Sequence, residues 1–434
     1  MKNKLLILSL LLLTSFLSAQ EVILITKSDV LSKVKENNNT IKMSQQDVLV
    51  AKGDYRQTNA VFLPNITASH TGISTTNPLM AFGSKLNQEI LTSADFNPVL
   101  LNDPTTTRSF ATKIEIQQPL INLDGFYQRK AAKAKMDAMS LKTERTIDYL
   151  SLEVTKAYMQ LQLAYKGLAV LESALATANA NKKMADNSFK QGFLQRADVL
   201  NIEIRVTEVK SQLQTAKSNV ENASNYLSFL MNEKSDVIYK PTENLKVASF
   251  NIDDKKISDN RADIKAMELA LKGYEAMNKA DKMAFLPRLN AFGSYEMYDN
   301  KVFQGDANGY LIGAQLSWDL FQGSKRFGKA QKSKAEFEKS KLEYNQYVSK
   351  SNLELNKVKR QLVDAKNRLE LTDLAVQQSK ESLRIRKNRF KEGLEKTSDL
   401  LLAETQFAQK QLEYYQTIFE YNFTQTYLEF LTKE

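Results

Sequence analysis

The sequence lacks cysteine entirely and has a single histidine, His70, among its 434 residues. Without cysteine there can be no disulfide framework, no thiolate nucleophile and no thiolate metal ligand. A lone histidine also has no second histidine or cysteine with which to build a metal cluster or a nucleophile–base pair. The composition therefore predicts that the protein is not an enzyme and holds no metal or cofactor.

Long apolar runs are also scarce. One run, from Leu5 to Leu13, follows Lys2 and Lys4 and precedes a small-residue site ending at Ala19. This pattern predicts a secretory signal peptide over residues 1–19, and the missing cysteine after it excludes a lipoprotein. No later segment approaches the roughly 20 apolar residues of a membrane-spanning helix. If the chain crosses a bilayer, it must do so with strands that form a closed barrel.

Charge is abundant but not concentrated. Lysine and arginine number 60 against 50 aspartates and glutamates, which gives a formal net charge of +10. The two signs are interspersed, as on solvated helical faces, and there is no arginine-rich tract. We therefore expect no nucleic-acid binding.

The chain contains an internal duplication. The pattern N-x-F-K-x-G, five residues, D-x-L-x-x-E occurs at residues 187–203 and again at residues 388–404. The triplet Phe-Leu-Pro at residues 62–64 likewise recurs at residues 285–287. Two copies of a long pattern indicate two copies of one structural unit. The predicted organisation is a first repeat (20–232) that includes a long loop (75–109), a connector (233–256) and a second repeat (257–434).

Each repeat contains strand-like alternation after its Phe-Leu-Pro triplet. The segments 110–117 and 310–319 alternate apolar with polar side chains, which predicts strands with one face for lipid and one for water. Tyr310 and Trp318 bracket the second apolar face in the manner of membrane-interface aromatics. The polar face, which would line a lumen, comprises Lys113, Glu115, Gln315, Ser317 and Asp319.

The pattern then changes to helical spacing. Apolar residues recur every three or four positions over residues 129–191 and 329–392, where glycine and proline are scarce. About 60 residues of helix would reach roughly 90 Å. Gly192 and Gly393 interrupt these helices, and the pattern resumes beyond them, so each copy is predicted to be a helical hairpin that reverses at a glycine. Asp198 and Asp399 fall at the start of the second helices, where a carboxylate is favoured.

Taken together, these segments resemble one family, the outer-membrane efflux proteins of the TolC type. The resemblance rests on the duplicated Phe-Leu-Pro, on P-L-I-N-L-D-G and D-L-F-Q-G-S after the strands, and on the duplicated F-K-x-G-x5-D-x-L turn. It implies a mainly α protein with a membrane β-barrel, in which three subunits with four strands each close a barrel of twelve strands. Their hairpins would form a periplasmic α-barrel.

The resemblance also implies a function. The chain would be a homotrimeric channel-tunnel in the lipid of the outer membrane of a Gram-negative bacterium, extending into the periplasm. It would passively conduct substrates from the periplasm, or from an inner-membrane pump, to the exterior. A periplasmic adaptor would dock at the hairpin tips, where Gly192, Asp198, Gly393 and Asp399 would form the entrance and gate. The alternatives are the outer-membrane component of type I protein secretion and, from another class, a periplasmic coiled-coil scaffold.

Overall fold

The computed structural model describes residues 22–249 and 256–434, so the predicted signal peptide lies outside the described residues. The chain forms two compact units, and each sequence repeat contributes to both. Unit 1 comprises Met1–Gln46, Leu141–Lys265 and Gln346–Glu434, and unit 2 comprises Asp47–Ser140 and Ala266–Asn345. The structural units therefore do not coincide with the repeats along the sequence.

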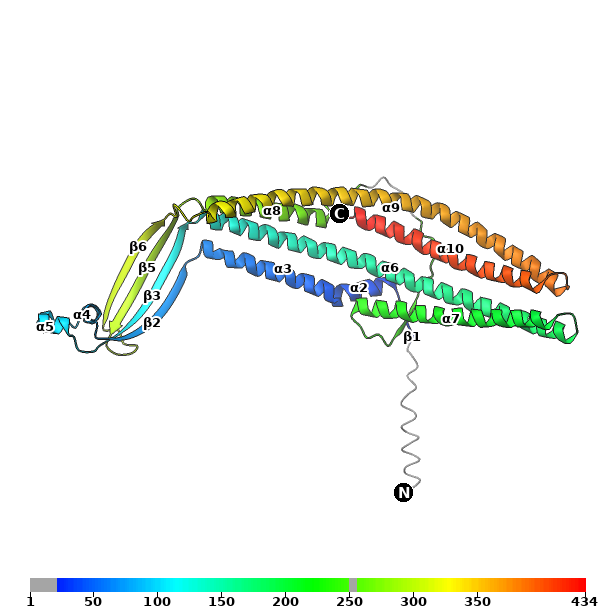
Figure 1. Cartoon of the computed structure of the whole chain (residues 1–434), viewed down its shortest axis with the longest axis horizontal. Coiled ribbons are helices and arrows are strands. Elements are labelled where there is room, and N and C mark those ends of the chain that lie inside the picture. The colour runs from blue at the N-terminus through cyan, green and yellow to red at the C-terminus, as the bar shows by residue number, and fades with distance from the viewer. Residues whose placement is uncertain (1–21, 250–255) are drawn as a thin grey trace, which may run out of the picture. The chain divides into compact units, whose positions relative to one another are not determined.

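Unit 2 contains an antiparallel sheet of four strands in the order β2-β3-β5-β6 (Figure 1). Each repeat supplies two neighbouring strands, and β3 pairs with β5 to join the repeats. The edge strands β2 and β6 each have one side without a strand partner in this chain. The four expected strands are thus confirmed, with bounds β2 (Asn65–Thr75), β3 (Thr107–Ile121), β5 (Arg288–Asp299) and β6 (Ala307–Ser317).

The segment between β2 and β3, predicted to be a loop, contains three short helices: α4 (Pro78–Asn87), the 3-10 helix η3 (Ser93–Phe96) and α5 (Pro98–Asn102). The pairs Asn77-Pro78 and Asn97-Pro98, which the sequence suggests are turns, are the starts of α4 and α5. The Asn77 Oδ1 accepts a hydrogen bond from the Met80 amide at 3.2 Å, with Pro78 as the first helical residue. Proline is tolerated at that position because its missing N–H has no partner there in any helix.

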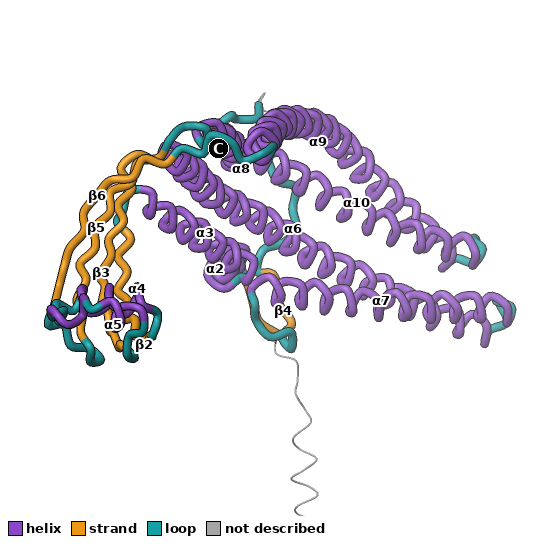
Figure 2. The backbone as a smooth tube through the Cα atoms, turned by 60° about the vertical axis from the view of Figure 1, so that its left-hand side comes forward, coloured by secondary structure: helices purple, strands orange, loops and turns teal. Residues whose placement is uncertain are grey.

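Unit 1 is built on two long helical hairpins, as the sequence predicts (Figure 2). The first joins α6 (Leu123–Lys190) to α7 (Arg196–Met231), and the second joins α9 (Lys325–Lys391) to α10 (Thr397–Thr432). The long members have 68 and 67 residues, so each reaches roughly 100 Å at about 1.5 Å per residue. The N-terminal ends of α6 and α9 belong to unit 2.

Two apolar cores hold unit 1 together. The first surrounds the fully buried Tyr158 and Leu161 of α6, and the second surrounds Val358 and Leu362 of α9. The connector enters both cores, since Tyr239 is 2% exposed in the first and Leu245 is 4% exposed in the second. Pro241 and the mixed charge of this segment favour an irregular connector on the outside of the bundle. Instead, its strand β4 (Ile238–Pro241) pairs in parallel with β1 (Val22–Ile25).

The sequence favours one helix over residues 28–61, which Pro64 ends, but in the structure this helix is interrupted at Asn38. It forms α2 (Lys27–Asn37), α3 (Asn39–Gln57) and the 3-10 helix η2 (Thr58–Val61), and in the second repeat α8 (Ala262–Met283) is a single helix. Asn38 is extended, with φ −62° and ψ 128°. Its Oδ1 accepts from the Thr40 amide at 2.8 Å and its Nδ2 donates to the Leu230 carbonyl at 2.7 Å. The second bond joins residues far apart in the chain, so local sequence could not predict it.

Within the described residues, no helix has both the length and the apolar character needed to cross a membrane.

Candidate functional site: hairpin tips and a two-faced sheet

Both hairpins reverse through the same backbone motif, at the same end of unit 1 (Figure 1). Gly192 and Gly393 have φ of 81° and 71°. Their amides donate to the carbonyls of Phe189 and Phe390, at 3.0 and 3.1 Å, and the next amides reach back five residues. This is the left-handed termination that glycine adopts most easily. Nothing lies within 4 Å of a Cβ built at either position, so backbone conformation alone selects glycine.

The charged side chains near the first tip find their partners within their own hairpin. The Asp198 carboxylate accepts from the Gln195 amide at 3.3 Å, as a helix-start acid does. Lys182 of α6 bridges Asp186 at 3.2 Å and Glu203 of α7 at 3.3 Å. These two hydrogen bonds raise the pKa of Lys182. The first hairpin is therefore cross-linked by ion pairs two turns from its reversal.

The second tip has a different set of charges. Glu395 lies between two arginines of α9, 2.7 Å from Arg386 and 2.8 Å from Arg389. Arg386 also lies 3.7 Å from Asp399, so this carboxylate is partly neutralised within its own chain. Both arginines precede Gly393, and neither is a fixed residue of the duplicated motif. Alignment of the two copies of the motif reveals them, because Arg386 and Arg389 align with the uncharged Ala185 and Ser188 of the first copy.

The sheet of unit 2 has one polar face. Lys113 and Glu115 of β3 point to the same side as Glu296 of β5, and Lys113 contacts both carboxylates, at 3.1 and 3.2 Å. The strand register also places Gln315 and Ser317 of β6 on this face, opposite Asn290 and Arg288. Asp319, which we assigned to the same strand, lies beyond it. The strand β6 ends at Ser317 because its neighbour β5 begins at Arg288 and offers no further partner.

The opposite face is apolar. One row across the sheet consists of Ala68, Ile114, Tyr295 and Tyr310, and the adjacent row contains Ile66, Ile116 and Ile312. The side chain of Ile312 is 78% exposed and that of Tyr310 is 80% exposed. Trp318 lies just past the strand end, 58% exposed, with its Nε1 donating to the Phe285 carbonyl at 2.9 Å. Such a large exposed apolar surface indicates an apolar neighbour.

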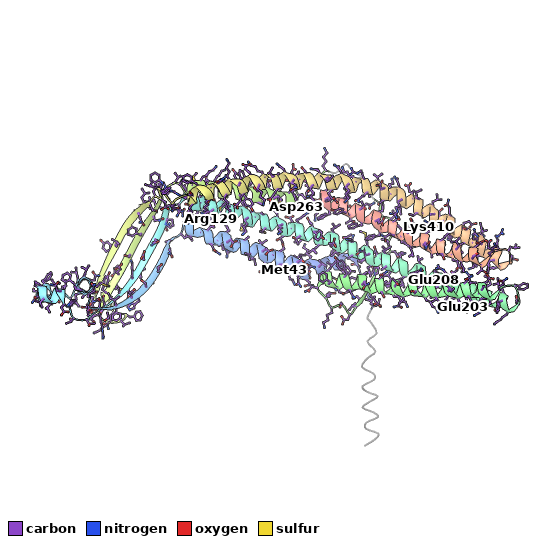
Figure 3. All side chains as sticks on the ribbon, viewed as in Figure 1. Met43, Arg129, Glu203, Glu208, Asp263 and Lys410 are labelled. Carbon is purple, nitrogen blue, oxygen red and sulfur yellow. The ribbon has the colours of Figure 1, made fainter. Side chains whose placement is uncertain are left out.

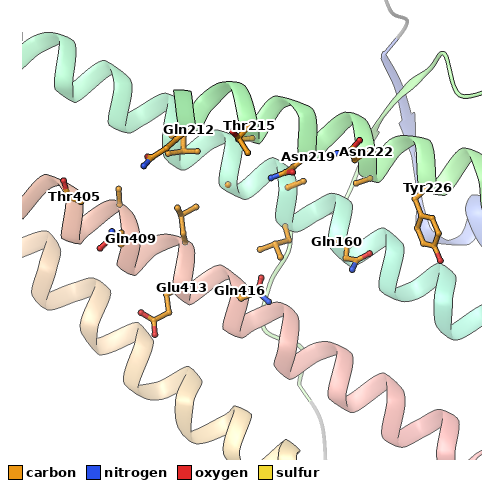
Figure 4. A pocket seen from close by; sticks show the side chains of 18 of the residues that line it. Gln160, Gln212, Thr215, Asn219, Asn222, Tyr226, Thr405, Gln409, Glu413 and Gln416 are labelled. Atoms are coloured by element: carbon orange, nitrogen blue, oxygen red, sulfur yellow. The ribbon is translucent and has the colours of Figure 1, made fainter. Parts of the chain in front are cut away.

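A groove in unit 1 runs between α6, α7 and α10 (Figure 4). Its volume is about 910 Å³. Amide side chains such as Gln160, Gln212, Asn219 and Gln409 line it, together with leucines such as Leu163. No sequence motif indicates this groove, because its lining comes from three helices.

His70 has a packing role in the sheet. Its Nδ1 lies 2.8 Å from the Thr112 Oγ1, and its ring stacks on Phe303 with the centroids 4.2 Å apart. Among the described residues, no group of three or more histidine, cysteine, aspartate or glutamate side chains is placed to hold a metal ion.

Comparison with known proteins gives the class. The family model described as outer membrane efflux protein matches residues 30–233 and 255–428. No curated protein sequence matches the chain. Among solved structures, the Campylobacter jejuni CmeC outer membrane channel is similar, with 17% identity and a TM-score of 0.79 over 94% of this chain and 85% of that one.

Two further structures share the fold. The outer membrane protein VceC from Vibrio cholerae has 16% identity and a TM-score of 0.78, with coverage of 93% of this chain and 95% of that one. The Neisseria gonorrhoeae MtrE outer membrane channel has 16% identity and a TM-score of 0.77, covering 94% and 88%.

The chain has the fold of these outer membrane channels. The chain belongs to the outer membrane efflux protein family, whose model covers most of its length. Its function is that of an efflux channel-tunnel, and the family is one of channels rather than enzymes. The family match confirms the resemblance to the TolC type and favours neither the periplasmic scaffold nor protein secretion.

Proposed function

We propose that this protein acts as a homotrimer in the outer membrane of a Gram-negative bacterium. The observation that carries the proposal is the sheet of unit 2, with ion-paired polar side chains on one face and exposed apolar side chains on the other. Four strands are too few to close a barrel, and β2 and β6 have unpaired edges. Such edges cost several kcal/mol per unsatisfied backbone group in lipid. Three copies, joined edge to edge, satisfy them in a barrel of twelve strands.

The same arrangement assigns the two faces. The apolar face contacts lipid, with Tyr310 and Trp318 at the membrane interface. The polar face lines a water-filled lumen with Lys113, Glu115, Gln315 and Ser317, while Asp319 lies at its end. Solutes then pass a hydrated wall whose charges are largely paired.

The hairpins of unit 1 extend into the periplasm and form the tunnel. The tips containing Gly192 and Gly393 form its entrance, where a periplasmic adaptor docks. Asp198 and Asp399 from three subunits bring six carboxylates to this end, of which Asp399 is held by Arg386. The sequence has no nucleotide-binding glycine loop. This fits a passive conduit, with energy supplied by an inner-membrane pump.

The tips can be tested at Gly393. Proline cannot adopt the positive φ of this residue, whereas asparagine tolerates it. We expect Gly393→Pro, and likewise deletion of residues 190–200, to abolish drug efflux in cells while the protein still reaches the outer membrane. Gly393→Asn is the matched control and should retain efflux. Normal drug resistance with Gly393→Pro would overturn the proposed role of the tips.

A further inference from the structure

The last residue of the duplicated motif has two different environments. In the first copy, Glu203 (labelled in Figure 3) is half-buried and pairs with Lys182 of its own hairpin at 3.3 Å. In the second copy, Glu404 stands at the same motif position but is only 7% exposed. The residue at the Lys182 position is Leu383 there, so α9 offers this glutamate no such ion pair. One motif residue has thus lost its local partner and become buried.

Glu404 instead bonds to the other hairpin. Its Oε1 accepts a hydrogen bond from the Asn181 Nδ2 of α6, and Asn181 is 1% exposed. This bond joins α10 of the second hairpin to α6 of the first. It lies seven residues into α10, so about 10 Å from the start of that helix at the tip. Any movement that separates the two hairpins near the tips must break it.

A small cavity of about 50 Å³ lies beside this carboxyl. Residues from α6, α7, α9 and α10 line it, and the only charged ones are Glu404 and Arg205 of α7. Arg205 is 7% exposed, and its Nε has no hydrogen-bond partner. One of its terminal nitrogens lies 3.4 Å from Glu208. A cavity of this size can admit water.

We propose that Glu404 is a proton-controlled latch between the two hairpins, neutral when the hairpins are packed together near their tips and ionised when they separate. One consequence rests on the proposed function: if the hairpin tips form the tunnel entrance, the latch sets how readily that entrance opens. The repeat comparison, the burial of Glu404 and its bond to Asn181 stand without it.

Electrostatics give the direction of the effect. Burial raises the pKa of the Glu404 carboxyl from 4.5 to about 7, against the opposing charges of Arg205 on α7 and Lys387 on α9. The side chain that α6 presents to it, Asn181, is neutral. A raised carboxyl pKa means that the packed form binds the proton more tightly than a hydrated, open form does. Packing is therefore favoured below about pH 4.5 and weakens as the pH rises through 7.

The two pKa values of Glu404, in the packed and in the hydrated state, set the size of the pH effect on hairpin opening. If the carboxyl has a pKa of about 7 when packed and about 4.5 when hydrated, the open-to-packed ratio rises about tenfold between pH 6 and pH 8. The local opening of backbone amides in α10 near Glu404 should rise by the same factor.

The test uses the full-length protein in detergent or nanodiscs. Hydrogen–deuterium exchange of residues 397–408 is measured at pH 6 and pH 8 and corrected for the intrinsic pH dependence of exchange. We expect about tenfold faster corrected exchange at pH 8 in the wild type, and no change in Glu404→Gln, which keeps the shape and stays neutral. Glu203→Gln, the matched control from the first copy, should behave as the wild type does.

A second measurement detects the proton itself. Infrared difference spectra between pH 6 and pH 8 should show loss of a protonated carboxyl band that is absent from Glu404→Gln and retained in Glu203→Gln. An unchanged pH response in Glu404→Gln, or no response in the wild type, would overturn the latch. Neither readout requires transport, so a failure of the proposed channel function would appear separately, as a protein that responds to pH but conducts nothing.

Discussion

Replacing Ile312 with arginine tests which face of the sheet contacts lipid. Ile312 is the sixth of the eleven residues of β6, so it lies at the middle of the strand, and its side chain is 78% exposed on the apolar face. An arginine that faces lipid at the midplane of a barrel costs about 2 to 4 kcal/mol. At about 1.4 kcal/mol per factor of ten, insertion would become roughly 30- to 700-fold less favourable for each subunit.

Leu311 provides the matched control. It precedes Ile312 in the same strand and is 58% exposed, but it pairs with Ser294 on the polar face. Leu311→Arg adds the same charge to the same strand and places it on the polar face. The assay is the amount of each variant in the outer-membrane fraction, with total expression as the reference.

We expect Ile312→Arg to be depleted from that fraction and Leu311→Arg to remain in it. Equal recovery of the two variants would refute the assignment of the faces. Depletion of Leu311→Arg alone would reverse it.

Two further predictions concern charges in unit 1. The Arg261 guanidinium is 3% exposed, and it donates to both carboxylate oxygens of Asp263 at 2.7 and 3.0 Å and to the Leu431 carbonyl at 3.0 Å (Asp263 is labelled in Figure 3). Arg261→Met should cost about 1.5 to 3 kcal/mol in chemical denaturation followed by helical circular dichroism, because it removes two charge-assisted hydrogen bonds from the half-buried Asp263 carboxylate, which keeps Tyr347 and Arg145 as partners. Arg384→Met, which removes an exposed pair with Glu381, should cost under about 1 kcal/mol, and equal losses would contradict this reasoning. Arg386→Ala frees Asp399 at the second tip, and since the pair is partly exposed, we expect at most about a fivefold rise in open probability in planar bilayers. A fall in open probability would contradict this expectation.

The sequence predicted the regular parts of the fold because they obey local rules. The hairpin helices follow from their apolar spacing, and their reversals follow from Gly192 and Gly393, whose left-handed backbone requires no tertiary contact. The faces of β3 and β6 follow from alternation. These features are set by neighbours a few residues away.

The remaining features depend on contacts between distant segments. The break at Asn38 depends on the Leu230 carbonyl, and the entry of the connector into the cores depends on where Tyr239 and Leu245 find apolar partners. The end of β6 at Ser317, which leaves Trp318 and Asp319 outside the strand, is set by where β5 begins. The burial of Glu404 could be suspected from the loss of the Lys182 equivalent, but its contact with Asn181 could not.

The most direct test of the channel-tunnel is the mass of the complex extracted by detergent from an outer-membrane fraction. Size exclusion with light scattering, corrected for bound detergent, gives the protein mass. We predict three copies of the chain, the number that the resemblance to the TolC type implies; the two unpaired strand edges of each copy require that the assembly be closed. A monomer or dimer recovered from the soluble periplasm would contradict the account.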